Sequence, residues 1–429
     1  MPAHQHRLRG VEPVTVRAAP DAAPAAVAAR PYPQTLFGET GSAGWQNLTG
    51  GPEGWSGSVD VSALAPGRQR LQVRVSAPDG TWWEQVALFT VPGTAADPVP
   101  RWEYRLPGAV QGGIALLDPE RGLTVAAGTG GEVVALRADG RPRWRARTGP
   151  VYRRPAVDTA RELVFVPSAD HHLRALDAGT GRPVWDFDAG APVLSAPVAA
   201  GDAVVFSAGG SLFALGAADG RVVWSVPGRG FSSGQAAWDG QRVYTTADDG
   251  YARAYDARTG APVWTYQMAT GTRHRVALYG GWDTVVALGA GPVVVATVSG
   301  TTALDAATGA VKWTRAGSTM YAPAVVVGDG TLLLTTEWGV LSRVDLATGT
   351  VVWQAGLGAR VFNAGVVVDR GTVWALSVDG KLLGVRLADG VPQGRLQHSL
   401  VYTFSRPVIA GDTLVVGDQN GVVRGIRLP

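Results

Sequence analysis

Tryptophan recurs at a nearly constant interval along most of this chain, and this interval constrains the fold more than any other feature. Successive members of the series are separated by 42, 41, 39, 40, 49 and 40 residues. A period near forty residues is typical of repeat folds in which each unit is one small sheet. The series consists of Trp102, Trp144, Trp185, Trp224, Trp264, Trp313 and Trp353.

Most of these tryptophans are the last residue of a motif similar to Leu-Asp-Ala-x-Thr-Gly-x-x-x-Trp, which we call the tryptophan phrase. Clear copies open on Asp177, Asp256, Asp305 and Asp345. We expect each aspartate to accept hydrogen bonds from the backbone of the turn it opens, and the glycine to supply a positive φ. The phrase therefore predicts a tight hairpin, and we expect the tryptophans to pack between neighbouring units.

Short apolar runs separated by turn residues indicate about four strands in each unit. Residues 163–166 and 173–176 are two such runs around a turn at 168–170, which fits a propeller blade. The last unit, from residue 401, is one strand short, and the segment at Trp102 is a strand without a unit. The sequence predicts an all-β, eight-bladed β-propeller of four-stranded blades, the last closed by the strand near Trp102.

Composition divides the chain into four parts. We predict a flexible lead-in rich in Ala, Pro and Arg at 1–30, a small β-sandwich at 31–92, a linker at 93–98 and the propeller at 99–429. We predict the strands of the sandwich from short runs in which apolar and polar residues alternate, separated by turn-forming residues. Four tryptophans of this region form either its core and edge or a platform for carbohydrate: Trp45, Trp55, Trp82 and Trp83.

Charge and residue usage exclude several classes of protein. With 38 basic and 35 acidic residues, the chain is too evenly charged for a dedicated nucleic-acid binder. The absence of cysteine excludes disulfides, thiolate metal sites and a catalytic thiol. No apolar run approaches the ~20 residues of a membrane helix. We also expect no signal peptide in the chain as it stands, because no apolar stretch follows the basic first residues.

The start of each unit carries a second pattern, an apolar residue followed by one that can form hydrogen bonds. Because successive strand residues face opposite sides, the hydrogen-bonding residues should project together at one mouth of the central channel. Three basic residues stand next to this column. The candidate ligand-binding residues are Gln111, Arg153, Arg154, Ser195, Ser232, His274, Arg275, Tyr321, Asn363, Ser405 and Arg406.

Two interpretations of this column remain open. It is either the polar lining of a water-filled channel, or a pocket for an anion or polar glycan with Arg153, His274 and Arg406 as charge-assisted donors. The interval of 49 residues before Trp313 indicates an insertion near 278–283, and insertions in repeats lie in loops. Paired acidic residues such as Asp248-Asp249 supply too few oxygens for calcium. We therefore predict no catalytic residues, no metal and no cofactor.

The tryptophan phrase resembles the repeat of the pyrroloquinoline-quinone-like propellers. This superfamily contains quinoprotein dehydrogenases and the non-catalytic outer-membrane assembly lipoprotein of the Bam complex. The resemblance covers residues 99–429 and implies an extracytoplasmic location. The dehydrogenases use adjacent cysteines and the lipoprotein an N-terminal lipidated cysteine, and this chain has neither. The departure disfavours a quinoprotein.

Residues 64–91 resemble the Ig-like module found beside bacterial calcineurin-like metallophosphoesterases, and His4-Gln5-His6 resembles the end of the metal motif of those enzymes. We interpret the chain as a non-catalytic binding or scaffolding propeller. Its partner is a protein or a polar, anionic ligand, and we expect a monomer. The alternative is the accessory region of a metallophosphoesterase whose catalytic domain lies upstream, and a quinoprotein dehydrogenase is less favoured.

Overall fold

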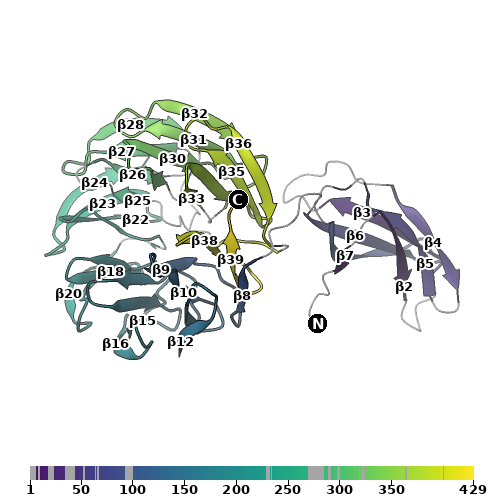
Figure 1. The fold of residues 1–429 in the computed structure, drawn as a ribbon, viewed down its shortest axis with the longest axis horizontal. Helices are drawn as coiled ribbons and strands as arrows, with labels where there is room; N and C mark the ends of the chain where they lie inside the picture. Colours follow the sequence, from purple (N-terminus) through teal and green to yellow (C-terminus); the bar gives the residue numbers. More distant parts are fainter. Residues whose placement is uncertain are drawn as a thin grey trace. The chain divides into compact units, whose positions relative to one another are not determined.

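A computed structural model describes residues 6–7, 10–17, 24–33, 44–51, 54–62, 64, 67–91, 100–228, 232, 234–268, 285–287, 291–296, 300–317, 319, 324–362, 365–399 and 401–429. The chain divides into two compact units, Met1–Asp97 and Pro98–Pro429. Within the described residues every regular element is a β-strand, so the predicted all-β class is confirmed (Figure 1).

The first unit is a seven-stranded sheet with the order β1-β7-β6-β3-β4-β5-β2. Its core contains Val27, Val59, Val73 and Phe89, all less than 10% exposed. The strands are β1 (His6–Arg7), β2 (Val11–Val16), β3 (Ala26–Pro33), β4 (Gln46–Gly51), β5 (Gly54–Asp60), β6 (Gly67–Ser76) and β7 (Trp82–Val91).

Strand β2 lies where the sequence predicts a flexible lead-in, and here the structure differs. It pairs antiparallel with β5 from Val11↔Asp60 to Val16↔Trp55. Val14 and Val16 pack against the core, whereas Val11 is 65% exposed. Strand β2 lies at the edge of the sheet, contains a proline and buries the side chains of only one face, and those only partly. Its alternation of apolar and polar residues is therefore too weak to be recognised in the sequence.

The tryptophans of the first unit occupy both of the predicted places, core and edge. Trp55 packs against the core. The guanidinium groups of Arg30 and Arg74 both lie over the Trp45 ring, at 4.5 and 4.4 Å from its centre. Trp82 is 56% exposed. Whether this surface takes a carbohydrate stays a prediction.

In the second unit, the described residues form eight four-stranded antiparallel sheets. The first four sheets are β9 (Ile114–Asp118), β10 (Leu123–Ala127), β11 (Glu132–Leu136) and β12 (Pro142–Arg147); β13 (Ala156–Asp158), β14 (Leu163–Pro167), β15 (His172–Asp177) and β16 (Pro183–Asp188); β17 (Val198–Ala200), β18 (Ala203–Ala208), β19 (Ser211–Gly216) and β20 (Val222–Val226); β21 (Ala237–Trp238), β22 (Arg242–Thr246), β23 (Tyr251–Asp256) and β24 (Pro262–Gln267). The next three are β25 (Val285–Ala287), β26 (Val293–Ala296), β27 (Gly300–Leu304) and β28 (Val311–Ala316); β29 (Val325–Val326), β30 (Thr331–Thr335), β31 (Val340–Asp345) and β32 (Val351–Gly356); β33 (Val366–Asp369), β34 (Thr372–Leu376), β35 (Lys381–Arg386) and β36 (Pro392–Gln397). The last sheet joins β37 (Val408–Ala410), β38 (Thr413–Gly417) and β39 (Val422–Arg427) to β8 (Trp102–Arg105).

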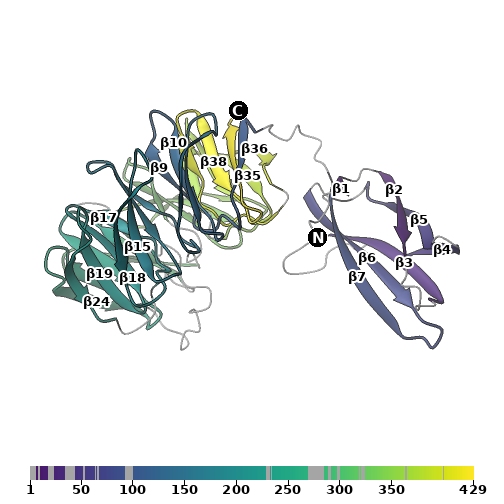
Figure 2. The ribbon, with the colours of Figure 1, turned by 90° about the horizontal axis from the view of Figure 1, so that it is seen from below.

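Strand β8 closes the last sheet from the other end of the second unit, as the sequence predicts. It pairs antiparallel with β39 from Gly425↔Trp102 to Val422↔Arg105, and Figures 1 and 2 show the blue strand beside the yellow one. The guanidinium of Arg101 donates to both carboxylate oxygens of Asp412, at 2.6 and 2.7 Å. The pairing gives the last sheet a fourth strand and removes the free edge of β39.

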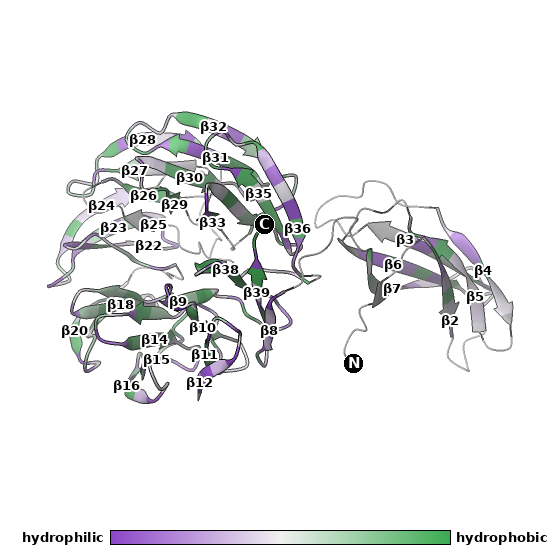
Figure 3. Cartoon of the chain, in the orientation of Figure 1, coloured by the Kyte–Doolittle hydropathy of each residue, from purple (hydrophilic) through white to green (hydrophobic). Residues whose placement is uncertain are grey.

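Apolar side chains pack between each sheet and the next around the unit. Val125 and Val164 belong to the core between the first two sheets, and Leu333 and Val373 to the core between the sixth and seventh. Another core joins the last sheet to the first through Val423 and the residues of β9–β11. Figure 3 shows the hydrophobic residues concentrated on the middle strands of the sheets. The second unit is thus a β-propeller whose core is a closed series of contacts between sheets.

A tryptophan on the outer strand of one sheet contacts the turn of the next sheet, and this tryptophan–turn contact recurs around the ring. The Trp144 ring also leaves no room for a side chain at Gly181, because a Cβ there would lie 2.5 Å from it. The Trp102 ring contacts Gly140 in the same way, although its indole N–H has no hydrogen-bond partner among the described residues. The other six indole N–H groups each donate to a turn carbonyl: Trp144 to Ala178 (2.8 Å), Trp185 to Ala217 (2.9 Å), Trp224 to Ala257 (2.9 Å), Trp264 to Ala306 (2.9 Å), Trp313 to Leu346 (2.9 Å) and Trp353 to Leu387 (2.8 Å).

The predicted hydrogen bonds of the Asp-x-x-Thr-Gly turns are confirmed. The Asp177 carboxylate accepts from the backbone N–H and hydroxyl of Thr180, at 2.7 and 2.6 Å. These bonds hold the pKa of Asp177 below its ordinary value. Gly181 has φ +72°, the left-handed conformation that glycine adopts without strain. Asp256, Asp305 and Asp345 make the same contacts.

One tryptophan of the repeat is missing, between the seventh and eighth sheets, and the closure explains why. In β36 the place of the tryptophan is taken by Gly394, opposite Gly384. The turn that would receive its ring would link β39 to β8, but these strands come from distant parts of the chain. A tryptophan there would have no glycine turn to contact.

We predict that Trp313→Ala lowers the free energy of unfolding of the propeller by about 3–5 kcal/mol, because the buried ring and its hydrogen bond are both lost. Trp313 is 8% exposed. Urea unfolding followed by circular dichroism measures the change. The matched control is Trp338→Ala, whose ring is 65% exposed and whose loss should cost within about 0.5 kcal/mol. Equal effects of the two substitutions would contradict this account.

We predict that a shortened chain beginning at Pro98 keeps a cooperative thermal transition, whereas one beginning at Pro107 melts at a lower temperature. The second variant lacks β8 and leaves the edge of β39 unpaired. Differential scanning calorimetry compares the two chains. If they melt at the same temperature, β8 does not hold the ring closed.

Candidate functional site

The residues predicted at the channel mouth divide into those that the structure describes and those outside the described residues. His274, Arg275, Tyr321 and Asn363 belong to the second group, so their grouping with the rest stays a prediction. The insertion near 278–283 lies outside the described residues as well, as do His4 and Gln5.

Three described members of the predicted column are buried and bond to backbone. Ser195 Oγ donates to the carbonyl of Ser207 and accepts from its N–H, at 2.9 and 2.7 Å. Ser405 makes the same pair of bonds with Gly417, at 3.0 and 2.9 Å. Arg153 is 8% exposed, and its Nε donates to the carbonyl of Leu194 at 2.7 Å. The two serines thus connect the segment before the first strand of a sheet to the second strand of the same sheet, and Arg153 connects its segment to the corresponding segment of the next sheet.

Two other predicted residues contact different parts of the ring. The Arg154 guanidinium donates to the side-chain oxygen of Gln235 at 2.7 Å, and the Gln111 amide donates to that of Gln419 at 3.3 Å. In the neighbouring, mostly apolar column, Tyr152 is 37% exposed, whereas Val110 is fully buried. Arg406 lies at the backbone of Gly113.

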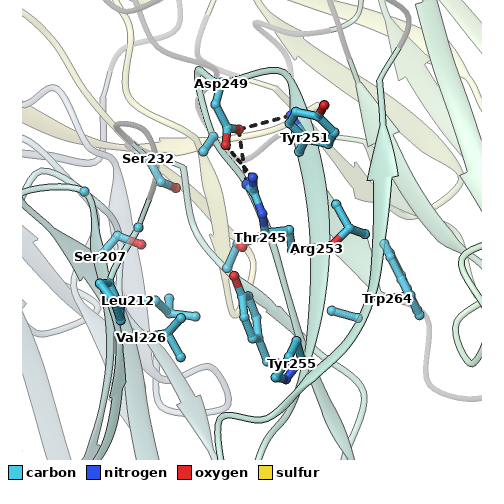
Figure 4. Close-up of a pocket in the computed structure, with 17 residues that line it drawn as sticks. Ser207, Leu212, Val226, Ser232, Thr245, Asp249, Tyr251, Arg253, Tyr255 and Trp264 are labelled. Atoms are coloured by element: carbon cyan, nitrogen blue, oxygen red, sulfur yellow. Dashed lines mark hydrogen bonds and ion pairs between the residues drawn. The ribbon is translucent and has the colours of Figure 1, made fainter.

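Ser232, the remaining member, lines a cleft between the third and fourth sheets that the sequence did not indicate. The cleft has a volume of about 730 Å³. Figure 4 shows Ser207 and Ser232 on one side of it and Arg253 reaching toward Asp249 on the other. Hydroxyl groups, a phenol ring and a guanidinium therefore share one space with the apolar side chains of β19 and β20.

The charges of this cleft are paired with each other. Arg253 Nη1 donates to Asp249 Oδ1 at 3.1 Å, and Nη2 contacts Oδ2. Burial would lower the pKa of Arg253, but the hydrogen bond and charge of Asp249 outweigh burial and raise it. The same spacing occurs two sheets earlier, where Arg174 bonds Asp170 at 2.8 and 3.0 Å. Because the same Asp–Arg pair recurs in another repeat, we interpret the pair as part of the turn structure. The four-residue spacing from aspartate to arginine is visible in the sequence.

Within the described residues, no group of three or more His, Asp or Glu side chains is placed to hold a metal ion. The same residues contain no helix long and apolar enough to cross a membrane. What the cleft offers is a set of fixed hydrogen-bonding groups.

His398 is a buried titratable group at the junction that lacks a tryptophan. Its ring is 6% exposed, and neither ring nitrogen has a hydrogen-bond partner among the described residues. Burial, and then the charge of Arg424, lower the pKa of His398 from 6.5 to about 3. Below pH 6.5, His398 is protonated in the unfolded chain but stays neutral in the folded chain. This histidine therefore lowers the free energy of unfolding as the pH falls.

We predict that the melting temperature falls between pH 7 and pH 5 by more in the natural chain than in His398→Leu, because leucine removes the group that titrates. The effect is present below the unfolded pKa of 6.5 and grows until the folded pKa of about 3. Thermal melts in buffers of equal ionic strength measure the difference. Parallel pH profiles for the two chains would show that His398 is not the buried group responsible.

The fold defines a class, the β-propellers. Comparison with known proteins then shows the family. The family model described as outer membrane protein assembly factor BamB matches residues 38–227, 169–319 and 299–428. These matches span more than half of the chain, and the chain belongs to this family of PQQ-like repeat proteins.

Individual relatives agree with the family. BamB of Burkholderia pseudomallei is 26% identical over 354 residues, which are 76% of each chain. BamB of Yersinia pestis is 24% identical over 290 residues, 62% of this chain and 71% of the relative. The crystal structure of BamB from Moraxella catarrhalis shares the fold, with a TM-score of 0.62 and 20% identity over 78% of this chain and 98% of that one. These names agree with the extracytoplasmic location that the sequence predicts.

Proposed function

We propose that this chain is a non-catalytic scaffold that binds protein partners during the assembly of outer membrane proteins. The family match over most of the chain carries the proposal, because the curated relatives bear the name of outer membrane protein assembly factors. The absence of cysteine removes the adjacent cysteines expected of a quinoprotein dehydrogenase.

The proposed architecture has two parts. The eight four-stranded sheets of the second unit are the eight blades of one monomeric ring. The first unit is an Ig-like module, which is supported by its strand order and by the parallel pairing of β1 with β7 beside otherwise antiparallel strands. We further propose that the channel-mouth residues His274, Arg275, Tyr321 and Asn363 gather with Arg406 as a polar rim.

Removal of the protein from the bacterium that encodes it tests the function. We expect the amounts of β-barrel proteins in the outer-membrane fraction to fall, measured by quantitative mass spectrometry. The intact chain should restore them, and the chain beginning at Pro107 should not, because its ring lacks β8.

Two results would count against the scaffold. One is an unchanged outer-membrane fraction after removal of the protein. The other is dehydrogenase activity of the purified chain supplied with pyrroloquinoline quinone and calcium, which would place it among the enzymes of the superfamily.

A further inference from the structure

The cleft between the third and fourth sheets lies at a position that aromatic rings fill between the second and third sheets. In the third sheet, Phe206 lies directly opposite Phe213, and their rings stack with centres 5.4 Å apart. Phe187 of the second sheet meets both rings edge to face, at 6.1 and 5.8 Å. The three rings belong to one apolar core, which occupies the space between these two sheets.

The fourth sheet has different residues at the same positions. Thr245 and Arg253 form the fourth residue pair between the second and third strands, as Phe206 and Phe213 do one sheet earlier. The third ring is replaced as well, because the residue two places after the outer-strand tryptophan is Val226. Thr245, Arg253 and Val226 all line the cleft of about 730 Å³. The cleft is thus the space that aromatic rings fill one sheet earlier.

Two hydroxyl groups of the cleft are buried and have no hydrogen-bond partner among the described residues. They belong to Ser207, which is 5% exposed, and to Tyr255, which is 9% exposed, and both residues line the cleft. Figure 4 shows the Tyr255 hydroxyl directed toward Thr245. A buried hydroxyl that gains no partner destabilises a fold. Both groups therefore need a molecule in the cleft to bond to, either water or a ligand.

The charges of the cleft balance, and this balance disfavours a charged ligand. Asp249 and Arg253 are the charged residues of its lining, and they pair with each other. A bound anion would meet the Asp249 carboxylate, and a bound cation would meet the guanidinium. An apolar ligand would cover the ion pair and the hydroxyls without bonding to them. The lining therefore favours a neutral molecule that carries many donors and acceptors.

A saccharide meets these requirements. Each sugar hydroxyl both donates and accepts a hydrogen bond, so it can bond to the Asp249 carboxylate, to the guanidinium or to another hydroxyl. The faces of a sugar ring carry C–H groups that pack on aromatic rings, and Tyr251, Tyr255 and Trp264 belong to the lining. The Arg253 guanidinium lies over the Tyr251 ring, 5.1 Å from its centre. This contact and the ion pair fix the polar groups before a ligand arrives.

A peptide fits the cleft less well than a saccharide. Ser207, Thr245 and Arg253 lie on β18, β22 and β23, and each of these strands is paired on both sides within its sheet. The polar groups of the cleft therefore lie away from any free strand edge to which the backbone of an extended peptide could bond. The hydroxyls and the ion pair also interrupt the apolar surface that an amphipathic helix needs.

We propose that this cleft binds a small neutral saccharide. The inference goes beyond the scaffold function and does not depend on it. The volume of about 730 Å³ lies within the range of about 300–1,000 Å³ that is usual for small-molecule sites. Ser207, Tyr255 and the Asp249–Arg253 pair bond to the sugar hydroxyls, and Thr245 leaves open the space that a phenylalanine would fill.

Isothermal titration calorimetry of the full chain with maltose, cellobiose and N,N′-diacetylchitobiose tests the proposal. We expect saturable binding of at least one of these disaccharides. Thr245→Phe should abolish the binding, because its ring fills the cleft as Phe206 fills the space one sheet earlier. Tyr255→Phe should weaken the binding roughly tenfold, the effect of one lost hydrogen bond. It should not lower the melting temperature, because it removes only the hydroxyl.

The matched control is Thr314→Phe, the same substitution at an exposed position of β28 in the fifth sheet, and it should bind as the natural chain does. The proposal is overturned if none of the three disaccharides binds saturably, or if Thr245→Phe and Tyr255→Phe both bind as tightly as the natural chain. It is also overturned if these variants instead change the binding of a sulfated heparin disaccharide or of tetra-alanine, which would assign the cleft to an anion or to a peptide. A failure here, with loss of outer-membrane proteins after removal of the chain, would leave the scaffold function standing and reject only this site.

Discussion

The contact between an outer-strand indole and the turn of the next sheet is the interaction on which the rest of the structure depends. A repeat unit of this kind cannot bury its hydrophobic face alone, so each sheet needs a neighbour in a defined position. The indole supplies this position in two ways. Its ring occupies the space that a side chain at the turn glycine would fill, and its N–H donates to a carbonyl of the same turn. The repeat phrase thereby encodes both a hairpin and its neighbour.

A ring built in this way leaves its loops free to vary. The tryptophan–turn contacts and the apolar cores lie between sheets, whereas the turn that contains Trp338 places an exposed side chain at the surface. Loops on a rigid scaffold are the usual location of binding residues.

The sequence predicted the parts of the fold that depend on repetition. The period, the Asp-x-x-Thr-Gly turns and the strand at Trp102 each follow from local chemistry that recurs, and the structure confirms them. Strand β2 was not predicted, because its pairing with β5 is specified by partners distant in sequence. The apolar alternation of an edge strand is too weak to reveal such pairing.

The candidate site was harder to predict than the fold. Alternation along a strand says that two columns face opposite ways, but it does not say which column meets solvent. Ser195 and Ser405 are buried against backbone, while Tyr152 next to their column is partly exposed. Which polar side chains are buried depends on backbone partners such as Ser207 and Gly417, and alternation along a strand does not identify these partners.

A disulfide across the closing pair of strands tests the ring most directly. The chain has no cysteine, and Glu103 lies opposite Arg424 in the pairing of β8 with β39. Side chains in directly opposed positions approach closely enough for a disulfide. In the variant Glu103→Cys with Arg424→Cys, mild oxidation should give one intramolecular disulfide in nearly every molecule, detected by intact mass and thiol titration. Two free thiols under the same conditions, or only disulfides between molecules, would mean that the ends of the propeller do not meet and that the ring is open.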